Sequence, residues 1–323
     1  MNKKVLVIVI GIILVLGGLV IYFEKSQKVE AEVKDSSNSI EITHELGTIN
    51  IDKVPERVVV LDYGALDVLD ALNVPISGVS KSNTMPDYLS KYAGDEYKSC
   101  GSIKEPDLEA INEIKPDLII MSGRMADYYE ELSKIARTLY VSVEGSDYMN
   151  TFKSTLETYG KIFDKEKQAQ ELYSNAVKKL SNLQEKTSDI DAKASFVMIN
   201  GKSLSTYGKN SRFGFLFNEM GFKEIDTSIE ASTHGSEINF EYLVNKDPEY
   251  IFVINRNTIV GNAEENTTSD MMENELIKKT TAYKNNRIIY LNTIYWYTIS
   301  GGYTSTMSMI EEVEKVFYLQ EKK

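Results

Sequence analysis

This chain of 323 residues contains one cysteine and two histidines. A single thiol, Cys100, cannot form an internal disulfide, so the fold has no disulfide framework, and a buried, inert thiol is expected. Two histidines and one cysteine also make a zinc site improbable. We therefore expect no permanently bound cofactor.

The sequence patterns of common enzymes are missing as well. The chain has no G-x-S-x-G, H-E-x-x-H or C-x-x-C pattern, and the NGKS stretch at Asn200 to Ser203 lacks the upstream glycine of a phosphate loop. These absences predict a protein that is not an enzyme.

Positive charge is scarce. Lysine and arginine total 36 against 48 acidic residues, and the net charge is -12. An acidic protein of this kind is a poor partner for nucleic acid or for an anionic lipid surface.

A long apolar run lies near the amino terminus. Val5 to Phe23 carries no charge and follows Lys3 and Lys4. At about 1.5 Å per residue, a helix of this length crosses a hydrocarbon core of ~30 Å, and the lysines place its amino end in the cytoplasm. No A-x-A cleavage pattern follows. We predict a membrane anchor at 1–24, a flexible tether at 25–39 and an extracytoplasmic remainder; a cleaved signal peptide is the alternative.

The rest of the chain alternates short apolar strands with helical patterns. Residues 40–52 alternate apolar and polar positions, which predicts a hairpin with His44 on an edge strand. The solidly apolar residues 57–62 predict a strand buried in a parallel sheet, and 75–79 the next strand. The alternation predicts an α/β fold with parallel sheets, and about 270 residues exceed one ordinary core, so two lobes are expected.

The pattern is helical throughout residues 148–186, and Asp164 is the predicted N-cap of a second helix there. Strand–helix alternation then resumes with ASFVMIN. We predict an N-terminal lobe at 40–163, a rigid bridging helix at 164–187 and a C-terminal lobe at 188–323.

An internal repeat connects the two lobes. Glu109 precedes Pro116 by seven residues, and Arg124 follows that proline by eight. The stretch from Glu241 to Arg256 has the same two spacings. Each Glu is expected to open a helix, each proline to end it, and each arginine to follow the next strand. Paired units of this kind predict facing lobes with a ligand cleft beyond the strand ends.

Arginine is the scarcer base, with six residues against thirty lysines. Arg124 and Arg256 follow predicted strands, and Arg212 lies in the turn-rich stretch YGKNSRFG. A guanidinium offers a planar fork of donors to paired anionic oxygens and stays charged when partly buried. The three arginines predict an anionic ligand; for any one of them, pairing with a neighbouring carboxylate is the alternative.

Several stretches, in order and in both lobes, resemble the ferric-siderophore-binding proteins of bacterial ABC importers, especially the catecholate and petrobactin binders. They are RVVVLDYGALDVLDAL, EPDLEAINEIKPDLIIMSGRMADYY, GKIFDKE, YGKNSRFGFL, EASTHG, YIFVINR and WYTISGGY. The resemblance implies a fold of the periplasmic-binding-protein type, with two Rossmann-like lobes bridged by a long helix. Gram-positive relatives usually carry a lipid-bearing cysteine after the apolar run; this chain has none there, which favours the transmembrane anchor.

The resemblance also implies roles for single residues. Arg124, Arg212 and Arg256 would face the anionic catecholate oxygens. His234 and Tyr297 would ligate the ferric iron when the siderophore leaves coordination positions empty. Ferric iron prefers oxygen donors, and phenolate is one of its protein ligands.

The remaining expectations concern partners. Trp296 is expected to contact the ligand, and the resemblance implies that Glu109 and Glu241, one on each lobe, dock on the permease. The predicted protein is a monomeric, membrane-tethered receptor that delivers a ferric catecholate siderophore to an ABC importer. The alternatives are a haem or corrinoid receptor of the same fold and, in a different class, an anchored extracytoplasmic hydrolase.

Overall fold

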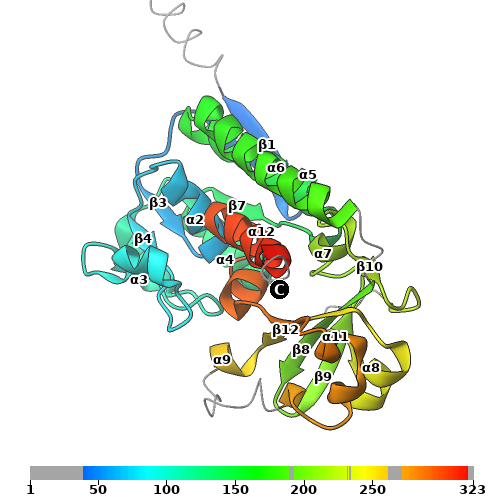
Figure 1. Cartoon of the computed structure of the whole chain (residues 1–323). Coiled ribbons are helices and arrows are strands. Elements are labelled where there is room, and N and C mark those ends of the chain that lie inside the picture. The colour runs from blue at the N-terminus through cyan, green and yellow to red at the C-terminus, as the bar shows by residue number, and fades with distance from the viewer. Residues whose placement is uncertain (1–38, 189–192, 231, 233, 261–270, 319–323) are drawn as a thin grey trace, which may run out of the picture.

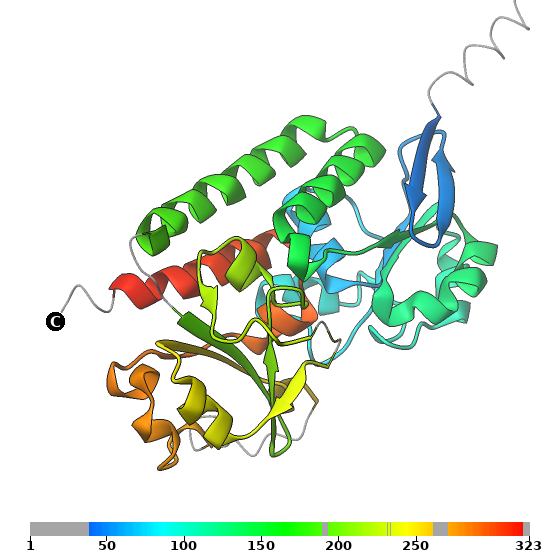
Figure 2. The ribbon, with the colours of Figure 1, turned by 90° about the vertical axis from the view of Figure 1, so that its right-hand side faces the viewer.

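The computed structural model describes residues 39–188, 193–230, 232, 234–260 and 271–318. Two α/β halves lie beside each other, and a pair of long helices runs along both (Figure 1, Figure 2). The predicted anchor at 1–24 and nearly all of the predicted tether lie outside the described residues. Within the described ranges, no helix is long and apolar enough to cross a membrane.

The N-terminal half is built on a five-stranded sheet of order β5-β4-β3-β6-β7, in which every pairing is parallel. Its strands are β3 (Val58–Val60), β4 (Gly78–Val79), β5 (Lys98–Ser99), β6 (Leu118–Ser122) and β7 (Thr138–Val141). Its helices are α2 (Tyr63–Ala71), α3 (Leu108–Ile114), α4 (Tyr129–Ile135) and the 3-10 helices η1 (Asp87–Ala93) and η2 (Gly123–Tyr128). The predicted parallel sheet is confirmed here.

The central strand β3 shows why its sequence is solidly apolar. Val58 and Val60 belong to the large core cluster that includes Leu66 of α2, whereas Val59 belongs to a separate cluster that includes Ile111 of α3. Successive side chains of a strand point to opposite faces, so a sheet covered on both faces buries every residue of its central strands.

The C-terminal half has a mixed sheet of order β11-β9-β8-β12-β13, with β10 also paired to β8. Its strands are β8 (Lys193–Asn200), β9 (Ser203–Tyr207), β10 (Lys223–Glu224), β11 (Ser236–Ile238), β12 (Tyr250–Asn255) and β13 (Ile288–Tyr290). Its helices are α7 (Phe215–Asn218), α8 (Phe240–Lys246), α9 (Asn257–Val260), α11 (Thr281–Lys284), η4 (Ile277–Lys279) and η5 (Ile294–Thr298).

The expected parallel pairing is found in this half for β10, β8, β12 and β13, but the sheet also contains antiparallel pairs. The NGKS stretch is the turn of a hairpin in which Asn200 pairs with Ser203, so β9 runs antiparallel to β8. Gly201, with φ of +62°, supplies the positive φ that a two-residue hairpin turn needs at its first position. The stretch is a strand connection and not a phosphate loop.

The internal repeat predicted from the sequence is confirmed. Helices α3 and α8 have seven residues each and begin at side-chain caps: Asp107 accepts from the Ala110 N–H at 2.9 Å, and Asn239 from the Tyr242 N–H at 2.8 Å. Both end at a left-handed residue directly before the proline, and strands β6 and β12 follow. A residue that precedes proline is disfavoured in helical conformation, so each helix stops there.

The two long helices between the halves are α5 (Tyr148–Phe163), which follows the short η3 (Gly145–Asp147), and α6 (Glu166–Ser188). The prediction that Asp164 caps the second helix is wrong. Asp164 is the left-handed C-cap of α5, with φ of 53°, and its N–H bonds to the carbonyl of Gly160. A side chain at Gly160 would meet Glu166 Cα at 3.0 Å, so glycine permits the tight turn.

The last helix, α12 (Tyr303–Tyr318), falls within the expected lobe at 188–323 and contacts both halves of the molecule. It packs against α2 and α6, and its first turn is bound by Asp67 of α2. The buried Asp67 carboxylate accepts from the N–H groups of Thr304 at 3.0 Å and Ser305 at 2.9 Å. The carboxyl-terminal segment thereby ties the two halves together.

Two smaller expectations are confirmed. Strands β1 (Ile40–His44) and β2 (Gly47–Ile51) form an antiparallel hairpin that places His44 at a strand end. Cys100 is a free, fully buried thiol, and burial raises its pKa to about 12, which keeps it protonated and inert.

Candidate functional site

A cavity of about 450 Å³ lies where the two halves meet, and residues of both halves line it. Arg124, Arg212, Arg256 and Tyr297 are all among its lining residues. Tertiary structure thus brings together four of the residues that the sequence singled out, although they lie far apart along the chain.

The secondary structure explains how the arginines reach this cavity. Arg124 lies in η2, directly after β6, and Arg256 follows the last residue of β12. Arg212 lies in the turn after β9. Ligands of open α/β sheets bind beyond the carboxyl ends of parallel strands, and two of the three guanidinium groups extend from such ends.

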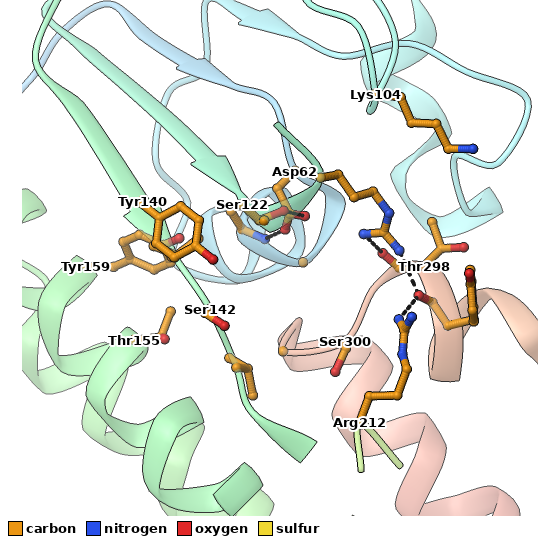
Figure 3. Close-up of a pocket in the computed structure, with 18 of the residues that line it drawn as sticks. Asp62, Lys104, Ser122, Tyr140, Ser142, Thr155, Tyr159, Arg212, Thr298 and Ser300 are labelled. Atoms are coloured by element: carbon orange, nitrogen blue, oxygen red, sulfur yellow. Dashed lines mark hydrogen bonds between the residues drawn. The ribbon is translucent and has the colours of Figure 1, made fainter. Parts of the chain in front are cut away.

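Tyr297 lies at the centre of the three arginines. Arg124 Nη2 and Arg212 Nη2 both donate to its main-chain carbonyl, each at 2.8 Å, and Arg124 Nη1 donates to the Thr298 carbonyl at 3.3 Å (Figure 3). The element that carries Tyr297, η5, is a π-helical turn. Such turns are rare in proteins overall, but those that occur are often found at functional sites. Here the carbonyls of the turn hold two guanidinium groups in place.

The phenol of Tyr297 contacts the third arginine, Arg256. Arg256 Nε donates to the Tyr297 hydroxyl at 3.2 Å, and its Nη1 donates to Asn200 Oδ1 at 2.9 Å. The Arg212 guanidinium lies 4.2 Å from the centroid of the Tyr297 ring. This geometry surrounds one phenol with positive charge.

The electrostatic result is a more acidic phenol. Burial by itself raises the pKa of Tyr297, but the charge of Arg212, the hydrogen bond from Arg256 and the charge of Arg124 together bring the pKa below the ordinary value of 10.0. Burial in turn lowers the pKa of Arg212. A phenol with a lowered pKa is a better phenolate ligand for a hard cation.

His234 lies close to this site but does not line the cavity. Its side chain is exposed, and its main-chain carbonyl accepts from the Tyr207 hydroxyl at 2.8 Å. The Tyr207 ring packs edge-on against Phe213, next to Arg212, with centroids 4.7 Å apart. The connection between His234 and Tyr297 is therefore indirect and passes through Tyr207, Phe213 and Arg212. The described residues contain no cluster of three or more His, Cys, Asp or Glu that could hold a metal ion.

Trp296 does not have the position expected for a ligand contact. It is 3% exposed, its Nε1 donates to Glu312 at 3.0 Å, and its ring packs near Phe196. Neighbouring residues of a helical turn point in different directions, so the turn that presents Tyr297 to the cavity directs Trp296 into the core. Trp296 is not among the residues that line the cavity, and its contact with a ligand stays a prediction.

Glu109 and Glu241 occupy equivalent positions outside the cavity. Each is exposed and is the second residue of its helix, α3 or α8. Neither forms an ion pair with another residue in the described part of the chain. Both carboxylates therefore face solvent at matching places on the two halves.

The sequence analysis missed several lining residues. They are the charged Asp62 and Lys104 and the hydroxyl-bearing Ser122, Tyr140, Ser142, Thr155, Tyr159, Thr298 and Ser300. Two of them could have been predicted from the sequence, because Asp62 and Ser122 lie at or just beyond the carboxyl ends of β3 and β6, where ligands of such sheets bind. Tyr159 lies on the apolar stripe of α5 and packs in the core, and such a stripe does not show that the helix also borders a cavity.

Comparison with known proteins places the chain. It matches the family of periplasmic binding proteins over residues 58–295. It is 39% identical over 280 residues to the petrobactin-binding protein YclQ of Bacillus subtilis, covering 85% of this chain and 87% of that protein. The ferric-anguibactin-binding protein FatB of Vibrio anguillarum is 34% identical, with coverage of 85% and 87%.

Solved structures agree with these sequence matches. The crystal structure of YclQ has a TM-score of 0.82 at 37% identity, covering 86% of this chain and 98% of that one. The periplasmic catecholate-siderophore binding protein VctP of Vibrio cholerae also has a TM-score of 0.82, at 35% identity and with coverage of 86% and 99%. The chain, with its two α/β halves, its long connecting helices and its cavity between them, belongs to the periplasmic binding protein family.

Proposed function

We propose that this protein is an extracytoplasmic receptor that binds a ferric siderophore with anionic, catecholate-type donors and passes it to an ABC importer. The observation that carries the proposal is the convergence of Arg124, Arg212 and Arg256 on one cavity between the halves. The relatives support it, since their names describe receptors for petrobactin, for ferric anguibactin and for catecholate siderophores.

The charge state of the cavity favours an anionic ligand. Among the described residues, none of the three arginines forms an ion pair with a carboxylate; they donate to carbonyl, phenol and amide oxygens instead. Their charges are therefore available to a ligand. A ferric catecholate is multiply anionic, and guanidinium groups bind such oxygens with charge-assisted hydrogen bonds. Haem and corrinoids do not require three of them.

The iron itself is cargo, and Tyr297 is its proposed protein ligand. When a siderophore supplies too few donors, a phenolate held between Arg212 and Arg256 can fill an open position on the metal. We include His234 as the second ligand by resemblance, although it would have to reach the iron from beside the cavity and not from its lining.

Delivery requires a membrane partner. We propose that Glu109 and Glu241 dock on the permease, one from each half, and that the monomeric receptor is held at the membrane by its apolar run at Val5 to Phe23. The matching exposure of the two carboxylates supports the first part. The mass of the native amino terminus tests the second: a mature chain that begins after residue 23 would contradict an uncleaved anchor.

A titration tests the ligand class. Purified protein is titrated with a ferric catecholate, a ferric hydroxamate and haem, and the emission of Trp296 reports binding. The catecholate complex should bind tightest, because each catecholate group is a dianion and each hydroxamate a monoanion, so the ferric catecholate brings more negative charge to the three guanidinium groups. Equal affinity for the hydroxamate, or tighter binding of haem, would contradict the proposal and favour the alternative receptor.

A further inference from the structure

The cavity has two chemically different ends. On one side lie Lys104, Arg212, Thr298 and Ser300; on the other lie Tyr140, Ser142, Thr155 and Tyr159, with Asp62 and Ser122 between the two groups (Figure 3). Arg124 belongs to the first side, because it donates to the Thr298 carbonyl. We call Asp62, Tyr140, Ser142, Thr155 and Tyr159 the hydroxyl end. It has no arginine or lysine among its members, and it contains the one carboxylate that lines this cavity.

Asp62 is unusual in a cavity built around arginines. One carboxylate oxygen accepts from the Ala65 N–H at 2.9 Å, and the other accepts from the Ser122 hydroxyl at 2.6 Å. A carboxylate has about four acceptor positions, so these two contacts leave capacity for further donors. A carboxylate repels an anionic ligand group and attracts a cationic one, and so it favours a ligand whose charge changes sign along its length.

Tyr159 is the second, independent observation. Its side chain is fully buried, and its hydroxyl has no hydrogen-bond partner among the described residues, although the residue lines the cavity. Buried polar groups are nearly always hydrogen-bonded, so a buried hydroxyl that has no protein partner and belongs to a lining residue has hydrogen-bonding capacity to offer a ligand.

Electrostatics of the neighbouring phenols agrees with this arrangement. Burial raises the pKa of Tyr159 well above its ordinary value, and the charge of Asp62 adds to the shift. Burial likewise raises the pKa of Tyr140; the charge of Glu45 adds to this shift, and the charge of Asp62 adds less. Both phenols therefore remain neutral at physiological pH. They can accept a hydrogen bond without adding charge, while Asp62 provides the negative charge of the cavity lining.

We infer that the hydroxyl end binds a protonated amine, or another N–H donor, in the organic part of the siderophore that lies away from its iron-binding groups. Asp62 provides the countercharge and the hydroxyls of Tyr159 and Tyr140 complete the hydrogen bonds. The inference rests on the proposed function, because the arginines must first hold the anionic ferric centre. It goes further by naming a selection rule: of two siderophores with the same ferric centre, the one with an amine in its linker binds more tightly.

A matched pair of ligands tests the rule. Two ferric catecholates are made with identical iron-binding groups, one with a secondary amine in its linker and one with a methylene at the same position. Wild-type protein should bind the amine ligand about tenfold more tightly or better, since a charge-assisted hydrogen bond is gained. Equal affinities for the two ligands would overturn the inference while leaving the proposed function intact. Binding of neither ligand would overturn both.

Variants identify the residues responsible. Asp62→Asn should abolish the preference without weakening binding of the methylene ligand, because the change removes a negative charge that repels an anionic ferric centre. Asparagine preserves the helix cap of α2. Tyr159→Phe should reduce the preference without loss of thermal stability, because it removes a hydroxyl that has no partner. Tyr92→Phe is the matched control: Tyr92 is buried in the same half, but its hydroxyl is bound to Asp70 away from the cavity, and the preference should persist. Equal losses for both ligands in Asp62→Asn would show a positioning role only and would overturn the assignment.

Discussion

The unit formed by α3 and β6 and the unit formed by α8 and β12 share a helix length, a capping pattern and a left-handed helix end, and each is followed by an arginine that lines the cavity. The contacts of the two arginines differ. Arg124 donates to main-chain carbonyls, at Tyr297 and Thr298, whereas Arg256 donates to side chains, at Tyr297 and Asn200.

This difference shows that a repeated framework sets where a guanidinium is, but not what it does. Arg124 belongs to the N-terminal half and binds the main chain of η5, a partner that persists whatever side chain is at position 297. Arg256 belongs to the C-terminal half and binds a phenol whose acidity it helps to set. The same spacing thus supplies one guanidinium that binds the main chain and one that binds the phenol directly; both charges lower the pKa of Tyr297, and Arg256 adds a hydrogen bond.

The largest expected effect concerns the outer ends of the same two units. Glu109→Ala combined with Glu241→Ala should abolish iron uptake in cells and leave siderophore affinity unchanged, because both carboxylates are exposed and neither lines the cavity. Uptake assays and ligand titrations measure the two quantities separately. Glu113→Ala, on α3 but paired with Lys98, is the control and should keep uptake.

If affinity falls together with uptake, the two glutamates belong to the cavity or to the fold. Single variants sharpen the comparison between the halves. Equal losses of iron uptake from Glu109→Ala and Glu241→Ala would mean that the permease contacts both halves alike. A loss of uptake from one variant alone would mean that only that half docks.

The next effect compares the arginines themselves. Replacing Arg124, Arg212 or Arg256 by glutamine removes a charged donor to the ligand, a loss of about 1.5–3 kcal/mol per bond, or roughly ten- to hundredfold in affinity for any ferric catecholate. Arg137→Gln is the control, because Arg137 is half-exposed and pairs with Asp52 away from the cavity. Unchanged affinity in all three cavity variants would contradict the proposed ligand class.

A smaller, ligand-dependent effect is expected for the proposed iron ligands. Tyr297→Phe and His234→Ala should weaken binding of a tetradentate siderophore, which leaves iron positions open, and have little effect on a hexadentate one. The visible charge-transfer band of the ferric complex should change with Tyr297→Phe if the phenolate ligates the metal. Equal losses for both siderophores would refute direct ligation and leave His234 a residue beside Tyr207.

The smallest expected effect is a shift in the pKa of the Tyr297 phenol. Tyr297 should ionise at lower pH than Tyr207, whose pKa burial raises to about 12, and the ultraviolet phenolate band records each. Because the folded-state pKa of Tyr297 lies below the unfolded value of about 10, its phenolate stabilises the fold above pH 10 and that contribution disappears as pH falls through the folded pKa. Arg256→Gln should raise the pKa of Tyr297 more than Arg124→Gln does. The reverse order would contradict the contrast between the two arginines.

Much of the architecture was predictable because its signals are local. The solid run of valines in β3 indicated a strand buried on both faces, and the spacing of glutamate, proline and arginine predicted both helix–strand units. The errors were local as well. Asp164 ends α5 instead of capping the next helix, because Asp164 is itself left-handed and Gly160 permits the tight turn. The antiparallel pairs of the second sheet follow from the hairpin turn at Gly201.

The sequence by itself determined which residues emerge beyond which strands, because a helix that stops at a proline and a strand of set length fix where Arg124 and Arg256 leave the sheet. Tertiary structure alone decided what those residues meet. Arg124 reaches a carbonyl 173 positions away, and Trp296 packs in the core while its neighbour Tyr297 faces the cavity. Periodicity along a chain reports which face of an element is apolar, but contacts between distant segments depend on how the two halves pack.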